Sequence, residues 1–414
     1  MNNKQSFEHS LLFTPQGVRD VYGRECREQN VIRGIIEQEM RLYGFRDIHT
    51  PGFEFFDIFN KERGTVPSNE MFKFFDQYNN TIVLRPDHTP QIARCVARYY
   101  ENEDMQLRLC YTGSTFRNQR GYQGKLSETT QIGAEIIGDA SSDADGEMLT
   151  LMIECFKKCG LNEFQIDVGH AGVFHGLVRE AGLNEDEIAR LRLFIQNKNS
   201  HAVEEMLKDR EIPGGVREVL VRMPEIFADE NSLQFVRERV NDEGTLRAIE
   251  RLDTLHDILE GFNMLDHVTL DLGLLGQMDY YTGVIFKAYT YGTGEAIASG
   301  GRYDSLMSQF GKDAPAVGVV FMLDQLMEGL RSEKVDISTP DEDVLVLYRS
   351  ANRTRAIELA TELRDNGTPV FLMRKNADVS LEEYKAYAAR RSLAEIRYID
   401  DTGEITIFEV DYRS

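Results

Sequence analysis

The sequence has no long apolar run and few cysteines. No apolar stretch in its 414 residues approaches the roughly 18 residues that cross a membrane. The polar N-terminus MNNKQSFEHS also lacks the apolar core of a signal peptide. Five scattered cysteines are typical of a protein in a reducing compartment, without structural disulfides. These absences predict a cytoplasmic protein that has no membrane partner.

Basic residues are also in deficit. Lys and Arg total 47 against 69 Asp and Glu, which gives a net charge of −22. Proteins that bind nucleic acids gain affinity from cations that neutralise phosphates, so this balance disfavours an RNA partner. Cys155 and Cys159 stand one helical turn apart, but no further Cys or His follows at the spacing of metal ligands. We expect neither a metal nor another cofactor.

Length and composition are those of an ordinary globular protein with room for one large domain and a small one. The large domain is predicted at 1–330. Within it, residues 171–263 carry apolar repeats at helical spacing and are expected to be helical throughout. Residues 331–341 are interpreted as a linker. The tail, 342–414, alternates strand and helix patterns and predicts a small α/β domain.

The segment Leu274–Asp304 combines tyrosines with closely spaced glycines. Its pattern predicts a strand carrying Tyr280 and Tyr281, a second strand, a Gly-rich turn and a further turn from Gly300 to Arg302. Adjacent glycines let the backbone approach a small bound molecule. The alternative interpretation is an ordinary sheet core with a tight hairpin.

Two further clusters of polar residues occur where strands are expected. Asp87 and Thr89 stand between a strand and a helix, where a carboxylate and a hydroxyl can bind an ammonium group; capping the helix is the alternative. Gln131, Gly133 and Glu135 alternate onto one face of a later strand. An acid directed into a sheet-lined pocket is costly unless it meets a cation or a donor, so a ligand is plausible here.

Several motifs together indicate a family. The segments DYYTG and GGRYD resemble the histidine-binding segment of histidyl-tRNA synthetases and of their catalytically silent relatives, the regulatory subunits of ATP phosphoribosyltransferase. Residues 25–51, 107–138 and 315–325 resemble motifs 1, 2 and 3 of class II synthetases, in that order. The resemblance implies an α+β fold: a class II aminoacyl-tRNA synthetase-like antiparallel sheet flanked by helices, with a helical insertion and a small α/β C-terminal domain. That last domain resembles a reduced anticodon-binding domain.

The resemblance also implies a set of histidine-binding residues. Arg117 occupies the motif 2 position that holds a carboxylate, which a guanidinium can bind in a bidentate pair. Gln131 and Glu135 match the residues that receive the amino and imidazole groups of the substrate. The complete implied set is Asp87, Thr89, Arg117, Gln131, Glu135, Tyr280 and Tyr281.

Departures from the synthetase pattern concern the groups that bind or activate ATP. Gly276 stands where the synthetase has an activating arginine, and Gln325 replaces the arginine that ends motif 3. Met322 replaces a glycine that leaves room for the nucleotide. Gln119 and Ser127 replace a glutamate and an arginine of motif 2. A phosphate clamp cannot lose its charges cheaply, so these changes predict histidine binding without adenylation and therefore no catalytic residue.

The resemblance thus implies a non-catalytic regulatory subunit of histidine biosynthesis. Its expected partner is the short-form ATP phosphoribosyltransferase catalytic subunit, which it would activate and make sensitive to the effector L-histidine. A homodimer through the motif 1 region, within a hetero-octamer, is expected, and tRNA is not expected as a partner. The alternatives are a true histidine–tRNA ligase, or a synthetase-like paralogue that senses another amino acid or serves a signalling kinase.

Overall fold

The computed structural model describes residues 12–59, 66–118, 125–225, 227–228, 230–276, 280–339 and 343–410. Contacts divide the chain into two compact units, Met1–Asp20 with Ile32–Val335 and Val21–Val31 with Asp336–Ser414. Across the described ranges, no helix is both long and apolar enough to cross a membrane. The same ranges contain no group of three or more His, Cys, Asp or Glu side chains placed to hold a metal ion.

The larger unit is built on a sheet whose described part has nine strands. Neighbouring strands from β5 to β7 are antiparallel, while β1 pairs with β5 and β9 with β7 in parallel. In spatial order the strands are β1 (Arg46–Asp47), β5 (Leu107–Phe116), β6 (Glu128–Ile137), β12 (Ala316–Met322), β11 (Ala298–Arg302), β10 (Val284–Thr290), β7 (Phe164–His170), β9 (Val268–Asp271) and β8 (Phe227–Ala228).

Helix α4 (Ser142–Lys158) covers one face of this sheet and contacts β11 and β12. It begins where the Ser141 side chain accepts a hydrogen bond from the amide of Ala144, a normal N-cap. Leu149, Met152 and Phe156 recur at helical spacing and are fully buried. The ring of Phe156 meets Phe321 of β12 edge to face, at 5.5 Å between centroids.

The opposite face of the sheet packs against α3 (Thr89–Tyr99) and α11 (Asp304–Ser308). Ile92 and Val96 of α3 join Leu109 of β5 and Leu306 of α11 in one buried apolar cluster. Three tyrosines of the same cluster, Tyr111, Tyr280 and Tyr303, bring hydroxyl groups into this apolar layer. Helix α2 (Gly23–Leu42) lies in the segment that resembles motif 1, and α12 (Leu323–Ser332) begins in the segment that resembles motif 3.

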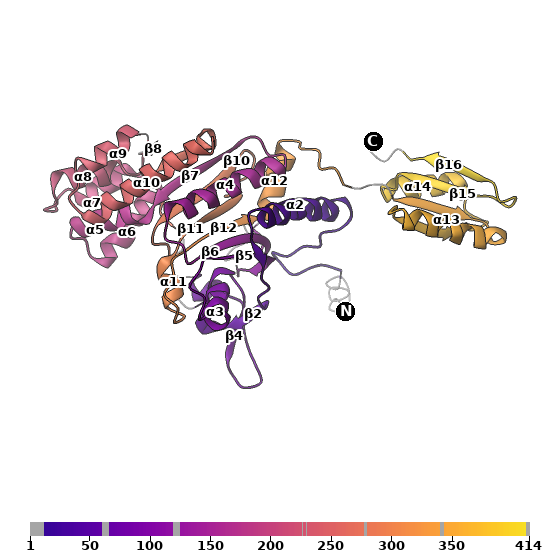
Figure 1. Ribbon diagram of the computed structural model, residues 1–414, viewed down its shortest axis with the longest axis horizontal. Coiled ribbons are helices and arrows are strands. Elements are labelled where there is room, and N and C mark those ends of the chain that lie inside the picture. Colours follow the sequence, from indigo (N-terminus) through magenta and orange to yellow (C-terminus); the bar gives the residue numbers. More distant parts are fainter. Residues whose placement is uncertain are drawn as a thin grey trace, which may run out of the picture. The chain divides into compact units, whose positions relative to one another are not determined.

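A group of helices is inserted between β7 and β9, beyond one end of the sheet (Figure 1). They are α5 (Ala171–Glu180), α6 (Glu185–Gln196), α7 (Ser200–Leu207), α8 (Gly214–Arg222), α9 (Glu230–Arg237) and α10 (Glu243–Gly261). The prediction of helix throughout is wrong at β8, which pairs with β9. Helix α10 packs on both α4 and α5, so the insertion is tied to the body of the sheet.

A separate small sheet precedes α3. It consists of β2 (Phe53–Phe55), β4 (Thr81–Leu84) and β3 (Lys73–Phe75), with β4 in the middle and both pairings antiparallel. Short 3-10 turns lie nearby and elsewhere in the chain: η1 (Phe56–Ile58), η3 (Ser68–Glu70), η4 (Leu265–His267) and η5 (Ser350–Asn352).

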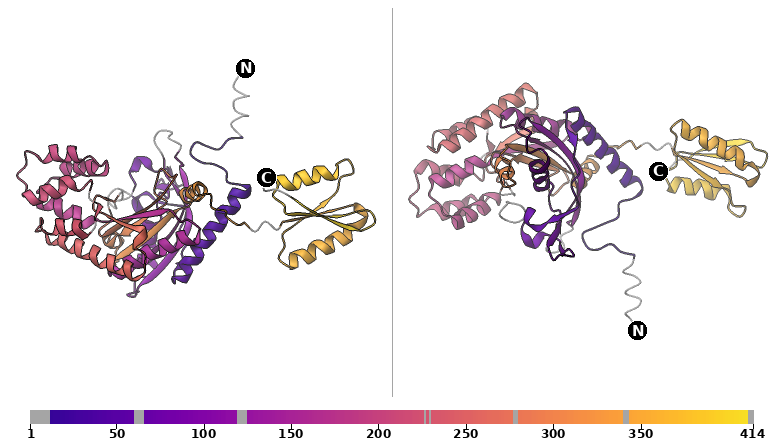
Figure 2. Two further views of the ribbon diagram at one scale, coloured as in Figure 1. Left: turned by 90° about the horizontal axis from the view of Figure 1, so that it is seen from above. Right: turned by 60° about the horizontal axis from the view of Figure 1, so that its bottom comes forward.

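The smaller unit has a four-stranded sheet between two helices, seen edge-on in Figure 2. Because side chains alternate along a strand, Leu345 and Leu347 of β13 face α14, whereas Val344 and Val346 face α13. The strands in order are β14 (Val370–Arg374), β13 (Val344–Tyr348), β15 (Glu395–Ile399) and β16 (Ile405–Glu409), and the helices are α13 (Arg353–Asp365) and α14 (Leu381–Arg390).

The predicted α+β class, with a helical insertion and a small α/β unit, is confirmed. The exact boundaries at 330 and 342 stay a prediction.

Candidate functional site

The face of the large sheet opposite α4 carries two polar side chains of β6, Gln131 and Glu135, together with glycines of β6 and the neighbouring strands. Strand register brings them together, because residues aligned across antiparallel neighbours share a face. Register aligns Glu135 of β6 with Gly318 of β12, and Gly318 with Gly301 of β11. Two positions along β6 and β12, Gly133 is opposite Val320, and a further two along, Gln131 is opposite Met322.

These side chains line a cavity of about 100 Å³. That volume is well above the ~10–15 Å³ that one water molecule requires, so the cavity has room for a small organic ligand. Seven lining residues are those predicted from the sequence: Asp87, Thr89, Arg117, Gln131, Glu135, Tyr280 and Tyr281. Sequence reasoning missed Tyr111, Lys287, Ser299 and Tyr303, which also line it. Tyr303 stands two residues after Gly301, and period-two alternation was the signal that could have found it.

Glu135 is the most enclosed acid of the cavity, with 1% of its surface exposed. Its carboxyl oxygens accept hydrogen bonds from the hydroxyl groups of Thr89, at 3.0 Å, and Tyr303, at 2.6 Å. Burial raises the pKa of Glu135 to about 8, although both hydroxyl donors act in the opposite direction. The ligand-free carboxyl group therefore keeps its proton near neutral pH, and a cation placed beside it would favour ionisation.

Asp87 lies beside Glu135, just before α3. Burial raises the pKa of Asp87, and the nearby Arg117 charge is the main opposing influence. One Asp87 oxygen accepts from the amide of Thr89 at 3.2 Å, and the other accepts from the hydroxyl of Tyr280 at 3.2 Å. Asp87 thus bonds to the first amide of α3 but is not its N-cap, because His88 holds that position and makes no side-chain cap bond. The capping alternative is therefore wrong, and Asp87 lines the cavity. Thr89 directs its hydroxyl to Glu135 instead.

Two polar groups of the cavity have unused hydrogen-bonding capacity. The Oε1 atom of Gln131 is buried without a hydrogen-bond partner, while its Nε2 atom donates to the sulfur of Met322 at 3.6 Å. Arg117 donates from Nε to the carbonyl of Pro86 at 3.3 Å. Within the described part of the chain, no carboxylate lies within ion-pair distance of Arg117. Buried polar groups are nearly always bonded, so the Gln131 oxygen is a candidate for contact with a ligand. Arg117 is only partly buried, and its charge is a candidate for pairing with a ligand anion.

The predicted turn at Gly300–Arg302 is wrong, because these residues continue strand β11. The glycines are needed for packing: a Cβ at Gly301 would fall 2.9 Å from the ring of Tyr281. The predicted strand carrying Tyr280 and Tyr281 is also wrong. Both precede β10, in a segment whose backbone bonds to Arg302 through the amides of Thr282 and Gly283.

Of the described residues that depart from the synthetase pattern, only Met322 lines the cavity. Met322 ends β12 and lines the cavity beside Gln131, so its side chain fills space that a glycine would leave open. Gln325 is on α12, and its buried Oε1 has no partner. Gly276 accepts a hydrogen bond from Arg192 of the insertion at 3.4 Å. Gln119 falls outside the described residues.

Comparison with known proteins identifies the family of the chain. A family model described as histidyl-tRNA synthetase matches residues 17–326. ATP phosphoribosyltransferase regulatory subunits of Acetivibrio thermocellus and Ruminiclostridium cellulolyticum are 34% and 35% identical, over 97% and 96% of this chain and 95% of each relative.

Solved structures agree with these relatives. A crystal structure from Bacillus halodurans, described as an ATP phosphoribosyltransferase regulatory subunit/histidyl-tRNA synthetase, has a TM-score of 0.82 at 31% identity, covering 94% of this chain and 97% of its own. Histidyl-tRNA synthetase from Nostoc sp. has a TM-score of 0.78 over 96% of both chains; at 19% identity it shows the fold alone. The chain belongs to the family of ATP phosphoribosyltransferase regulatory subunits, which has the fold of histidyl-tRNA synthetase.

Proposed function

We propose that the cavity binds L-histidine and that this chain is a non-catalytic regulatory subunit. Its partner would be the short-form ATP phosphoribosyltransferase catalytic subunit, which it activates and makes inhibitable by histidine in the first step of histidine biosynthesis. The names of its relatives support a regulatory role. The cavity supports a small dipolar ligand as the effector.

One observation carries the choice of ligand: Gln131 presents a buried, unpartnered acceptor in the same cavity as the protonated acid Glu135. An ammonium or imidazole N–H would supply the missing donor. The carboxylate of the amino acid would pair with Arg117, which has no carboxylate partner within the described chain. Asp87 would balance the positive end of the ligand, and the tyrosine rings would enclose its side chain.

The absence of catalysis is the second part of the proposal. Activation of an amino acid by ATP requires cations around the phosphates, and Gly276 and Gln325 supply none. Met322 occupies the cavity wall on the side where its sulfur meets Gln131. The match to the histidyl-tRNA synthetase family favours the rival function, histidine–tRNA ligation. Histidine-dependent exchange of pyrophosphate into ATP, above a no-enzyme control, would show that the chain activates histidine and would contradict this part of the proposal.

Calorimetric titration of histidine into the isolated protein tests the site. Glu135→Ala and Arg117→Ala each remove a charge-assisted hydrogen bond worth roughly 1.5–3 kcal/mol, so each should weaken histidine at least about tenfold. Glu128→Ala is the matched control, because Glu128 starts the same strand but is exposed. Unchanged affinity in both cavity variants, with the circular dichroism of the wild type, would refute the assignment.

Mixing this protein with the short transferase tests the function. We expect a stable hetero-oligomer, a transferase activity that the catalytic subunit lacks alone, and inhibition by histidine. With Glu135→Ala the complex should stay active but lose most of its sensitivity to histidine, because the variant changes only the effector site. A catalytic subunit that is fully active alone, or that elutes separately on a sizing column, would contradict the regulatory role.

A further inference from the structure

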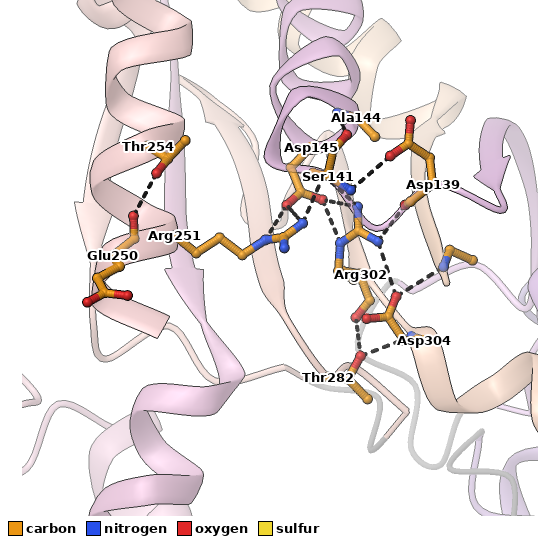
Figure 3. A network of polar contacts seen from close by, with 11 residues as sticks. Asp139, Ser141, Ala144, Asp145, Glu250, Arg251, Thr254, Thr282, Arg302 and Asp304 are labelled. Carbon is orange, nitrogen blue, oxygen red and sulfur yellow. Dashed lines mark hydrogen bonds and ion pairs between the residues drawn. The ribbon is translucent and has the colours of Figure 1, made fainter. Parts of the chain in front are cut away.

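On the α4 side of the large sheet, opposite the face that carries the cavity, lies a buried group of charges, drawn in Figure 3. Asp145 of α4 receives Arg302 of β11 at one carboxylate oxygen and Arg251 of α10 at the other, with Nε–oxygen distances of 2.9 and 2.8 Å. Asp145 is fully buried and Arg302 is 2% exposed. These three residues, which we call the Asp145 cluster, connect the sheet, α4 and the helical insertion.

The cluster satisfies its own hydrogen bonds and is therefore no ligand site. Beyond Asp145, the Arg302 guanidinium donates to the carbonyls of Asp139 and Ser141, at 2.8 and 3.1 Å, and to the carboxylate of Asp304 at 3.2 Å. Arg251 donates to the same Ser141 carbonyl at 2.9 Å. Burying ions costs free energy that their pairing often only offsets, so such a cluster is better explained by the geometry it imposes than by stability.

The Asp145 cluster holds Arg302 in place, and Arg302 in turn bonds to the backbone beside the cavity. The carbonyl of Arg302 accepts from the amides of Thr282 and Gly283, at 2.8 and 3.3 Å, and so fixes the backbone that immediately follows Tyr280 and Tyr281. The Thr282 hydroxyl also connects this segment to α11, since it accepts a hydrogen bond from the amide of Asp304 at 2.9 Å. The next residue after Arg302 is Tyr303, which donates to the buried Glu135.

The helical insertion reaches this segment in two places. Arg251 approaches from α10 through Asp145, as described above. Independently, the amide of Ala171, at the start of α5, donates to the carbonyl of Gly283 at 2.9 Å. Helices α5 and α10 pack against each other, so the two connections come from neighbouring helices of the insertion.

We propose that the helical insertion positions the ligand cavity, with Arg251 acting through Asp145 and Arg302 on the backbone next to Tyr280 and Tyr281. The identity of the ligand rests on the proposed function, but the linkage does not. Within the described part of the chain, the hydrogen bonds and ion pair of Arg251 go to Asp145 and Ser141 and not to a cavity residue, so it is a positioning residue. The insertion thereby becomes part of the effector site, and any partner that displaces α10 would alter the affinity for the effector.

Hydrogen exchange at the amides of Thr282 and Gly283 tests the linkage without any ligand. In Arg251→Met we expect exchange at both amides to quicken by roughly tenfold or more, as local opening becomes easier, while amides of β5 and β13 keep their rates. The control is Arg247→Met, one turn earlier on α10, where an exposed arginine pairs with Glu243. Unchanged exchange at Thr282 and Gly283 would overturn the proposal, as would equal acceleration throughout the protein.

Histidine titration supplies the second readout. Arg251→Met should weaken histidine by roughly three- to thirtyfold, the range typical of residues that couple distant sites, and Arg247→Met should not. Arg251→Lys should recover part of the loss, because it keeps the charge beside Asp145 but not the second bond to Ser141. Wild-type affinity in Arg251→Met would overturn the proposal. If the wild type binds no histidine, the proposed function fails while the exchange rates still decide the linkage.

Discussion

Glu135 keeps a raised pKa although its carboxyl group is hydrogen-bonded. The group is almost completely buried, and two hydroxyl groups donate to it. Hydrogen bonds from Thr89 and Tyr303 stabilise the anion, but the loss of solvent outweighs them, so the pKa is raised to about 8. A carboxyl group in this state responds to the charge of whatever occupies the cavity.

The raised pKa of Glu135 predicts a specific pH dependence of stability. Below pH 4.5, its ordinary pKa, the group is protonated in the folded and unfolded states alike. Between pH 4.5 and about 8 only the folded state keeps the proton, so the group lowers the free energy of unfolding by about 1.4 kcal/mol per pH unit as the pH rises. Glu135→Gln removes this slope.

Urea unfolding of the ligand-free protein at pH 5, 6, 7 and 8 measures the effect. The difference in free energy of unfolding, Glu135→Gln minus wild type, should increase steadily with pH. Glu128→Gln, on the exposed end of the same strand, should follow the wild type. Parallel curves for the wild type and Glu135→Gln would mean that Glu135 titrates normally.

At the scale of single residues, local pattern explains which parts of the site were predictable. Gln131 and Glu135 alternate along one strand, so their common face is visible in the sequence. The Asp145 cluster was not visible, because Arg251 and Arg302 are 106 and 157 residues away from Asp145. Tyr280 and Tyr281 were predicted in a strand because aromatic residues favour strands, but they lie in a loop whose next two residues, Thr282 and Gly283, bond to Arg302.

Among the secondary-structure elements, the small sheet of β2, β3 and β4 has an exposed aromatic face. Phe55 and Phe74 are both opposite Ile82 of β4, and Phe53 is opposite Leu84, so these phenylalanines share one face. Their exposed fractions are 55% for Phe53, 51% for Phe55 and 38% for Phe74. Contiguous exposed apolar side chains mark interaction sites, and this face follows the motif 1 region through which a homodimer is proposed.

We therefore expect Phe53→Ser with Phe55→Ser to weaken self-association of the isolated protein. Loss of burial for two aromatic side chains is worth roughly 3 kcal/mol or more, a change of more than about a hundredfold in the dissociation constant. Sedimentation equilibrium measures it. Phe75→Ser is the control: Phe75 is 71% exposed on the other face, opposite Thr81. A dimer equally stable in both variants would exclude this face from the interface.

For the whole molecule, regulation of the proposed partner leads to one thermodynamic requirement. If histidine lowers the affinity of the assembled transferase for its substrates, the substrates must lower the affinity for histidine by the same factor. Titrating histidine into the assembled complex, with and without saturating substrate, should reveal that factor. Histidine affinities that do not depend on substrate would mean that histidine leaves substrate binding unchanged, so that any inhibition would act on the catalytic rate.

The order of strands in the large sheet determines which strand edges stay unpaired while the chain is being synthesised. Strand β12, near the end of the larger unit, inserts between β6 and β11 and completes the middle of the sheet. Asp87 and Tyr280, which meet in the cavity, are 193 residues apart. At a translation rate of ~5–20 residues per second, the ribosome needs on the order of 10–40 s to make that interval. Until β12 emerges, β6 and β11 lack their shared neighbour and present open edges to other chains. The nascent polypeptide is therefore most prone to aggregate before it can bind any effector.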